Sequence, residues 1–288
     1  MIVVGVDGSQ AALAAVSWAA REAAARDGAL SIVHAMPAWP LEVSEEGRYA
    51  EVGRWMREGA TSMLDAALER ARQEDPRVVA EPRLLGGDPR AILIETAADA
   101  ELLVVGNHGL GGFAGMLLGS VALGVAGRAA CPVAVVRDPA TPPAGEVVVG
   151  VDGSAAGVGA LGFAFAEASL RGAGLRAVHA WSRPVAGGGP FALRVAEETA
   201  EAERRLLAEA LAGWSERYPD VKVTEQLEHG HPARVLAEAS AHAGLLVVGS
   251  RGRGDLTGLL LGSVSHSLLH HATCPLVVTP APASPGLS

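Results

Sequence analysis

Lysine is almost absent from this sequence of 288 residues: of 23 basic residues, only Lys222 is a lysine. A Walker-type phosphate-binding loop needs a Gly-Lys-Ser/Thr motif, and none occurs here. A Schiff-base lysine or a lysine general base would have Lys222 as its sole candidate. The sequence therefore excludes the lysine-dependent class of nucleotide sites, and any phosphate site must use other donors.

Cysteines and aromatic residues are also scarce. Aromatics make up 4% of the chain, so its core must consist mainly of alanine, valine and leucine. The two cysteines, Cys131 and Cys274, are each followed by proline and are too few for a disulfide framework. We expect them to be small, buried packing residues in a cytoplasmic protein.

An excess of basic charge is missing too. The net charge is −9 and the isoelectric point about 5.5, which argues against nucleic acid or an anionic membrane as partner. No apolar run approaches the ~18 residues of a membrane span. The first four residues lack the basic region of a signal peptide. With 49% hydrophobic and 19% charged residues, the chain is too apolar to be disordered.

The sequence contains a tandem repeat. The heptapeptide Val-Val-Gly-Val-Asp-Gly-Ser occurs at 3–9 and again, unchanged, at 148–154. Residues 102–137 and 245–280 are identical at 17 of 36 positions. We therefore predict a duplicated unit with the following boundaries: a first domain at 1–137, a proline-rich linker at 138–145, a second domain at 146–280 and a flexible tail at 281–288.

Each copy alternates short, buried β-branched runs with amphipathic stretches, which predicts an α/β fold with a parallel sheet between two helix layers. Ser9 and Asp88 are expected to cap helices. The strands expected in the first copy are 2–6, 30–35, 78–85, 102–105 and 133–136. The helices expected are 11–26, which ends near Gly28, and 48–72, 89–100, 120–128, 155–171, 194–218, 232–243 and 263–271.

Glycine-rich loops follow the fourth strand of each copy. Residues 106–120 and 249–263 share the pattern G-x2-G-x9-G-S. Glycines allow the backbone to approach a ligand closely, and the Gly-Ser pair opens a helix whose free N–H groups suit a phosphate. The alternative is a flexible connection. Two copies with identical spacing favour a phosphate site, built without lysine.

An aspartate follows the first strand of each copy, at Asp7 and Asp152. At the carboxyl end of a parallel strand, its carboxylate can accept a hydrogen bond from a ribose hydroxyl or an adenine amine. The alternative is that each aspartate caps the following helix. Duplication does not separate these two interpretations, because a cap would be duplicated as well.

The strand-one aspartate, the glycine loop and the final Cys-Pro strand resemble the nucleotide-binding branch of the universal stress protein family, over 1–137 and 146–279. The resemblance implies two five-stranded, Rossmann-like domains, similar to adenine nucleotide alpha hydrolase-like proteins, and ATP as ligand, with or without Mg²⁺. It also implies dimers through the last strand. We expect pairing of 133–136 with 276–279, a homodimer of chains and a protein partner that the sequence does not identify.

The resemblance also implies which residues contact the nucleotide. Arg251 and Arg253 would favour polyphosphate in the second copy and Asp255, which replaces Gly112, would oppose it, so we expect unequal affinities. The implied contacts are Asp7, Ala35, Gly106, Gly109, Gly119, Ser120 and Val121 in the first copy, and Asp152, Ala180, Gly249, Gly252, Gly262, Ser263 and Val264 in the second.

The function we predict is a cytoplasmic, ATP-binding regulatory protein of the stress type, without catalytic or metal-binding residues. The alternatives are a slow ATP hydrolase or nucleotidyl-transfer enzyme, and a dimerisation module that binds no nucleotide. No repeated acid–base pair accompanies the glycine loops. The repeated His34 and His179 are interpreted as structural. The cluster of His266, His270 and His271 has no counterpart in the first copy.

Overall fold

The computed structural model describes residues 1–44, 47–110, 118–137, 145–182, 190–252 and 261–281. The chain divides into two compact units, Met1–Ala140 and Thr141–Ser288. Nearly all of the predicted linker (138–145) and of the predicted tail (281–288) lies outside the described residues. The boundaries expected from the repeat stay a prediction.

The first unit contains a parallel sheet in the order β3-β2-β1-β4-β5. The chain adds β2 and β3 on one side of β1 and then returns to add β4 on the other. Order reversal of this kind leaves a crevice beyond the carboxyl ends of β1 and β4, where ligands bind in open α/β sheets. The strands are β1 (Ile2–Gly5), β2 (Ala29–Met36), β3 (Val79–Gly86), β4 (Leu102–Gly106) and β5 (Val133–Val136).

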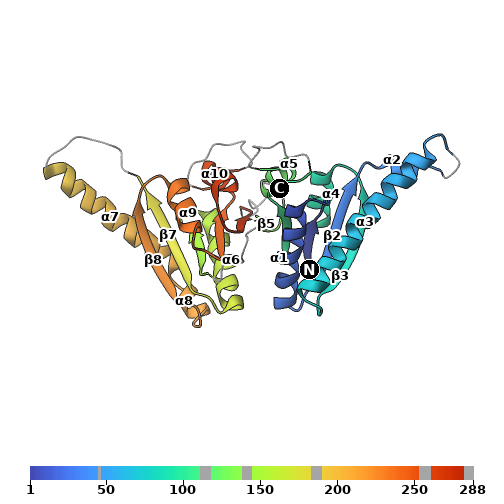
Figure 1. Cartoon of the computed structure of the whole chain (residues 1–288). Helices are drawn as coiled ribbons and strands as arrows, with labels where there is room; N and C mark the ends of the chain where they lie inside the picture. Colours follow the sequence, from blue (N-terminus) through green and yellow to red (C-terminus); the bar gives the residue numbers. More distant parts are fainter. Residues whose placement is uncertain (45–46, 111–117, 138–144, 183–189, 253–260, 282–288) are drawn as a thin grey trace, which may run out of the picture. The chain divides into compact units, whose positions relative to one another are not determined.

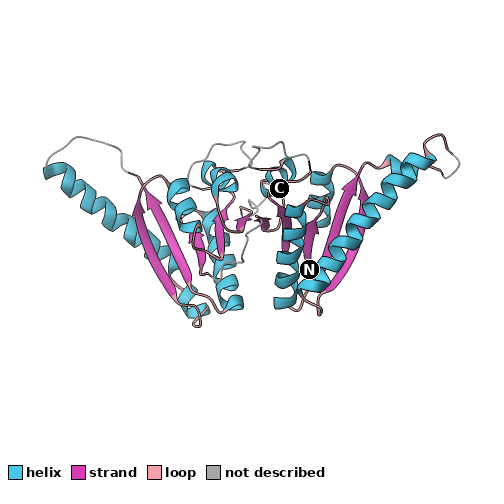
Figure 2. Cartoon of the chain, viewed as in Figure 1, coloured by secondary structure: helices cyan, strands magenta, loops and turns pink. Residues whose placement is uncertain are grey.

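Helices cover both faces of this sheet (Figure 1, Figure 2). One layer contains α1 (Gln10–Ala25) and α3 (Ala50–Glu74), which pack on each other, and the other contains α4 (Pro89–Thr96) and α5 (Ser120–Ala126). The short α2 (Trp39–Glu42) precedes α3. Crossovers between parallel strands are right-handed, so connections that run in opposite directions across the sheet place their helices on opposite faces. The chain changes direction across the sheet after β3, and the helices that follow therefore cover the second face.

The second unit repeats the architecture, in the order β8-β7-β6-β9-β10. The predicted fold class is confirmed in both units. Its strands are β6 (Val147–Gly150), β7 (Leu175–Trp181), β8 (Val223–His229), β9 (Leu245–Gly249) and β10 (Leu276–Thr279), and its helices are α6 (Ala155–Arg171), α7 (Pro190–Leu211), α8 (Trp214–Arg217), α9 (Pro232–Ser240) and α10 (Ser263–His271).

The predicted helix caps at the amino ends are confirmed. The Ser9 Oγ accepts a hydrogen bond from the Ala12 N–H at 3.1 Å. The Asp88 carboxylate accepts bonds from the N–H groups of Arg90 and Ala91, at 3.0 and 3.3 Å. The Arg90 side chain, bonded to the same carboxylate, holds the pKa of Asp88 at about 2. These caps fix the starts of α1 and α4 at the edge of the sheet where the crevice opens.

Helix ends were predicted less well. The stretch expected as one helix over 194–218 is two, because Gly213 adopts a left-handed φ of 80° between α7 and α8. The helix expected over 89–100 ends at Thr96, and turns bring the chain back to β4. Asp27, with φ 48°, and not Gly28, takes the left-handed position after α1.

The core consists of aliphatic strand residues, as the shortage of aromatics requires. Leu102, Leu103 and Val104 of β4 are fully buried, as are Leu245 and Leu246 of β9. Burying each such side chain contributes about 1.5–3 kcal/mol to folding. No helix in the described ranges combines the length and the apolarity that crossing a bilayer requires.

Both cysteines are buried: Cys131 is 5% exposed and Cys274 is 1% exposed. Burial raises the pKa of the Cys131 thiol, which disfavours its reactive thiolate. We expect Ellman's reagent to titrate neither thiol in the native protein and both after denaturation in guanidinium. Fast labelling of the native chain would contradict the role as packing residues.

Candidate functional site

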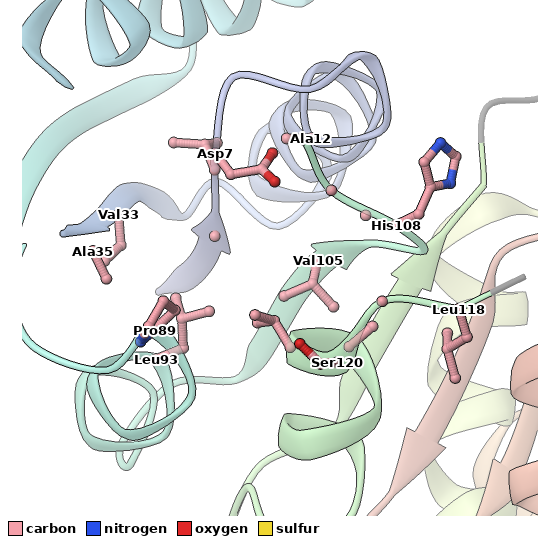
Figure 3. Close-up of a pocket in the computed structure, with 17 residues that line it drawn as sticks. Asp7, Ala12, Val33, Ala35, Pro89, Leu93, Val105, His108, Leu118 and Ser120 are labelled. Carbon is pink, nitrogen blue, oxygen red and sulfur yellow. The ribbon is translucent and has the colours of Figure 1, made fainter. Parts of the chain in front are cut away.

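A cavity of about 470 Å³ opens beyond the carboxyl ends of β1 and β4 in the first unit (Figure 3). It lies at the point where the strand order reverses. The structure brings together at its wall all seven positions singled out from the first copy. They are Asp7, Ala35, Gly106, Gly109, Gly119, Ser120 and Val121.

One side of this cavity is apolar. Val33 and Ala35 come from β2, and Pro89 and Leu93 come from α4, and Figure 3 shows all four grouped together. A surface of this kind suits a flat, weakly polar ring. The sequence prediction included only Ala35. Pro89 and Leu93 could have been found, because a proline and a leucine recur 143 residues later, at 232 and 236.

Asp7 holds two loops together at the rim of the cavity. Its Oδ1 accepts a hydrogen bond from the Ser9 N–H at 3.0 Å, and its Oδ2 accepts one from the Leu110 N–H at 3.0 Å. The first bond closes the turn before α1, and the second joins that turn to the glycine loop. The side chain that caps α1 is Ser9. Asp7 therefore organises the cavity rim whether or not it also contacts a ligand.

At two positions of the loop, contacts with neighbouring residues leave no room for a side chain. A Cβ on Gly106 would lie 2.8 Å from backbone atoms of Ala11, so any side chain there would push β4 away from α1. A Cβ on Gly109 would overlap the Asp7 carboxylate. The first part of the G-x2-G-x9-G-S pattern is therefore required by packing around the cavity, independently of any ligand.

The opposite side of the cavity is the start of α5. The Gly119 N–H donates to the Asn107 carbonyl oxygen at 2.7 Å, which fixes the chain as it enters the helix. Gly119 provides no side-chain cap, and within the described residues nothing accepts from the N–H groups of Ser120, Val121 and Ala122. These donors make this side suited to an anionic group.

The second unit has an equivalent cavity of about 340 Å³. Gly262 likewise donates its N–H to the Ser250 carbonyl oxygen at 2.7 Å, and a Cβ on Gly252 would lie 2.5 Å from the Asp152 Oδ2. All seven positions singled out from the second copy line it: Asp152, Ala180, Gly249, Gly252, Gly262, Ser263 and Val264.

The two cavities differ in chemistry. Arg251 lines the second cavity where His108 lines the first. Trp181 and Glu203 also line the second, and the sequence prediction missed both. Glu203 lies on α7, far from the loops in sequence, and no motif marks it. The prediction of unequal affinities was based on Arg251, Arg253 and Asp255. Arg253 and Asp255 lie outside the described residues, as does Gly112, which Asp255 replaces.

Metal ligands do not gather in the described part of the chain. No three histidine, cysteine, aspartate or glutamate side chains there are grouped closely enough to hold an ion. The rings of His266 and His270 lie on one face of α10 with their centroids 5.1 Å apart.

Comparisons with known proteins find related sequences and similar solved structures. Universal stress protein Rv2005c of Mycobacterium tuberculosis is 42% identical over 289 residues, which cover 96% of each chain. A universal stress protein crystal structure from Archaeoglobus fulgidus covers 97% of this chain and 96% of its own, with 22% identity and a TM-score of 0.67. A universal stress protein solved in complex with cAMP matches 48% of this chain and 96% of its own, with 34% identity and a TM-score of 0.37.

The model of the universal stress protein family matches the chain twice, at residues 1–137 and 144–280. Both glycine loops and both strand-one aspartates fall within these matches. The chain therefore belongs to the universal stress protein family, as a member with two such domains in tandem.

Proposed function

We propose that this protein binds ATP in both cavities and acts as a nucleotide-dependent regulator in the cytoplasm. Nucleotide occupancy would set its conformation or its association, and through them its partners. The proposal rests on one observation above all. The fourteen positions that the family resemblance implies as nucleotide contacts lie around two equivalent cavities and nowhere else.

The form of each cavity supports an adenine nucleotide. The apolar side formed by Val33, Ala35, Pro89 and Leu93 would receive the base. The N–H groups at the start of α5 would receive phosphate, which accounts for a phosphate site in a chain with a single lysine. Volumes of about 470 and 340 Å³ lie within the range of small-molecule sites.

In the first cavity, the hydrogen bonds already made by the Asp7 carboxylate favour ATP binding over ATP turnover. Asp7 is the only carboxylate among the described residues that line it, and both its oxygens already accept backbone hydrogen bonds. A general base must be free to take a proton from the attacking water. Incubation with labelled ATP is expected to give little or no product, and many turnovers per minute would favour the hydrolase alternative.

Titration calorimetry of the full chain with ATP tests the binding proposal. We expect two ATP per chain, with unequal affinities because Arg251 adds a positive charge to the second cavity alone. Nucleotide extracted from the freshly purified protein should contain adenine. A protein without bound nucleotide that also gives no heat with ATP would contradict the proposal. Pairing of the two units and a homodimer of chains stay predictions, which sedimentation velocity tests.

A further inference from the structure

Glu203 of α7 places a carboxylate in the wall of the second cavity. Its Oε2 lies 2.7 Å from the Nε2 of His179, which also lines the cavity. Its Oε1 accepts no hydrogen bond from any residue that the structure describes. The Glu203 side chain is 22% exposed, so this oxygen can be reached. One oxygen of the carboxylate is therefore held by the protein, and the other is available to a ligand.

The first cavity differs at this point. Among the described residues that line it, the one carboxylate is Asp7, whose two oxygens already accept from the N–H groups of Ser9 and Leu110. His34, which occupies the position of His179, does not line this cavity. A carboxylate oxygen without a partner in the described part of the chain thus distinguishes the wall of the second cavity from that of the first.

The strand order places Glu203 at the end of the cavity proposed for the base. Glu203 contacts β7 through His179, whereas the start of α10, which is equivalent to the proposed phosphate site at α5, follows β9. In the sheet, β7 and β9 lie on either side of β6. Neighbouring strands are about 4.8 Å apart, so β7 and β9 are separated by roughly 10 Å. The carboxylate therefore approaches the base, and lies away from the phosphates that it would repel.

The backbone of Ala180 lies at the same end of the cavity. Successive residues of a strand direct their N–H and C=O groups to opposite neighbouring strands. The carbonyl oxygen of Val178 accepts from the Val151 N–H, beside β6, and that of Trp181 accepts from the Gly230 N–H, beside β8. The backbone groups of Ala180 are therefore directed to the side of β6, beyond its carboxyl end, where the cavity that Ala180 lines is open.

These acceptors suit a base whose edge donates hydrogen bonds. A carboxylate oxygen only accepts, so it recognises an N–H group of the base. The amino group of adenine carries two hydrogens, and the Ala180 carbonyl oxygen can accept one while the free oxygen of Glu203 accepts the other. In the first cavity, Ala35 is grouped with apolar side chains, none of which accepts a hydrogen bond. An amino group there has the backbone acceptor alone.

We propose that Glu203 makes the second cavity selective for aminopurine nucleotides, by accepting a hydrogen bond from the amino group of the base at its free carboxylate oxygen. The first cavity contacts the base without a side-chain acceptor and discriminates less. The proposal rests on the proposed function, because it names the group that one of the two nucleotide sites recognises. It gives the two domains different selectivity, although their glycine loops have the same spacing.

Titration calorimetry with ATP and with purine riboside triphosphate tests this selectivity, because the second nucleotide lacks only the amino group. The second cavity is measured in a Gly119→Val chain and the first in a Gly262→Val chain. We expect the preference for ATP to be about tenfold larger at the second cavity, the effect of one hydrogen bond to a charged group. Adding Glu203→Met removes the acceptor with little change in size, and should lower this preference to that of the first cavity.

Two further variants make the result specific, each with a thermal melt to verify folding. Glu203→Gln keeps an acceptor oxygen, and should retain more of the preference than Glu203→Met. Glu201→Met makes the same change elsewhere on α7, at a side chain that is 61% exposed, pairs with Arg204 and does not line the cavity. It should retain the whole preference.

The comparison of the two nucleotides separates recognition of the base from a purely structural role. If Glu203 only holds His179 in place, Glu203→Met lowers the affinity for both nucleotides by the same factor. That result, or an equal preference for ATP at the two cavities, would overturn the proposal and leave nucleotide binding standing. Failure of both nucleotides to bind at either cavity would instead overturn the proposed function, and the selectivity with it.

Discussion

Replacing Gly119 by valine is expected to reduce the ATP stoichiometry of the full chain from two to one. Gly119 has φ −76° and ψ 148°, which valine adopts without strain. Its Cβ would lie 3.2 Å from the His108 Cα, a tight contact in which the backbone must shift by a few tenths of an ångström. The two added methyl groups would stand at the cavity wall, beside the N–H groups proposed to hold phosphate. Titration calorimetry with ATP measures the loss directly.

The matched variants make this result specific. Gly262→Val should remove the other site, and its Cβ meets only ordinary contacts, at 3.5 Å from the Arg251 Cα. The double variant should bind no ATP. Gly59→Val makes the same change on the exposed face of α3, where a Cβ meets nothing within 4 Å, and should keep both sites. Two ATP still bound by Gly119→Val would show that the start of α5 is not part of the site.

The repeat and the strand pattern were enough to predict the fold, because buried parallel strands are read from continuous aliphatic runs. Helix caps were predicted equally well, because Ser9 and Asp88 accept hydrogen bonds from N–H groups only two or three residues later in the chain. Helix ends depend on more distant structure. Gly213 takes a left-handed conformation that ends α7, although many helices tolerate a glycine.

The candidate site likewise contains features that a local sequence pattern predicts and features that depend on packing between distant elements. Positions in the glycine loops could be found because their spacing is duplicated. The steric role of Gly106 could not be predicted from the sequence, because its closeness to Ala11 depends on how α1 packs against β4. The same holds for Glu203, which contacts His179 from 24 residues away with no repeat to mark it. Contacts made by packing between elements leave no local pattern in the sequence.

Removing the carboxylate of Asp7 is the second change from which we expect a large effect. Asp7→Ala deletes acceptors for the N–H groups of Ser9 and Leu110, and so separates the turn before α1 from the glycine loop. Hydrogen bonds to a charged group contribute about 1.5–3 kcal/mol each when buried, and less at a partly exposed rim such as this one. We expect ATP affinity at the first cavity to fall about tenfold or more, with the second cavity unchanged.

Two companion variants separate organisation of the rim from direct contact with ligand. Asp152→Ala should weaken the second cavity alone, because the Asp152 Oδ1 accepts from the Ser154 N–H at 2.9 Å in the same way. Asp7→Asn keeps one oxygen to accept from Ser9 and should lose less affinity than alanine, as measured by calorimetry with a thermal melt to verify folding. If Asp7→Ala binds ATP as tightly as the unaltered chain, the rim does not need its carboxylate. If Asp7→Asn loses as much as alanine, the first site requires either the charge or the second acceptor, which receives the Leu110 N–H.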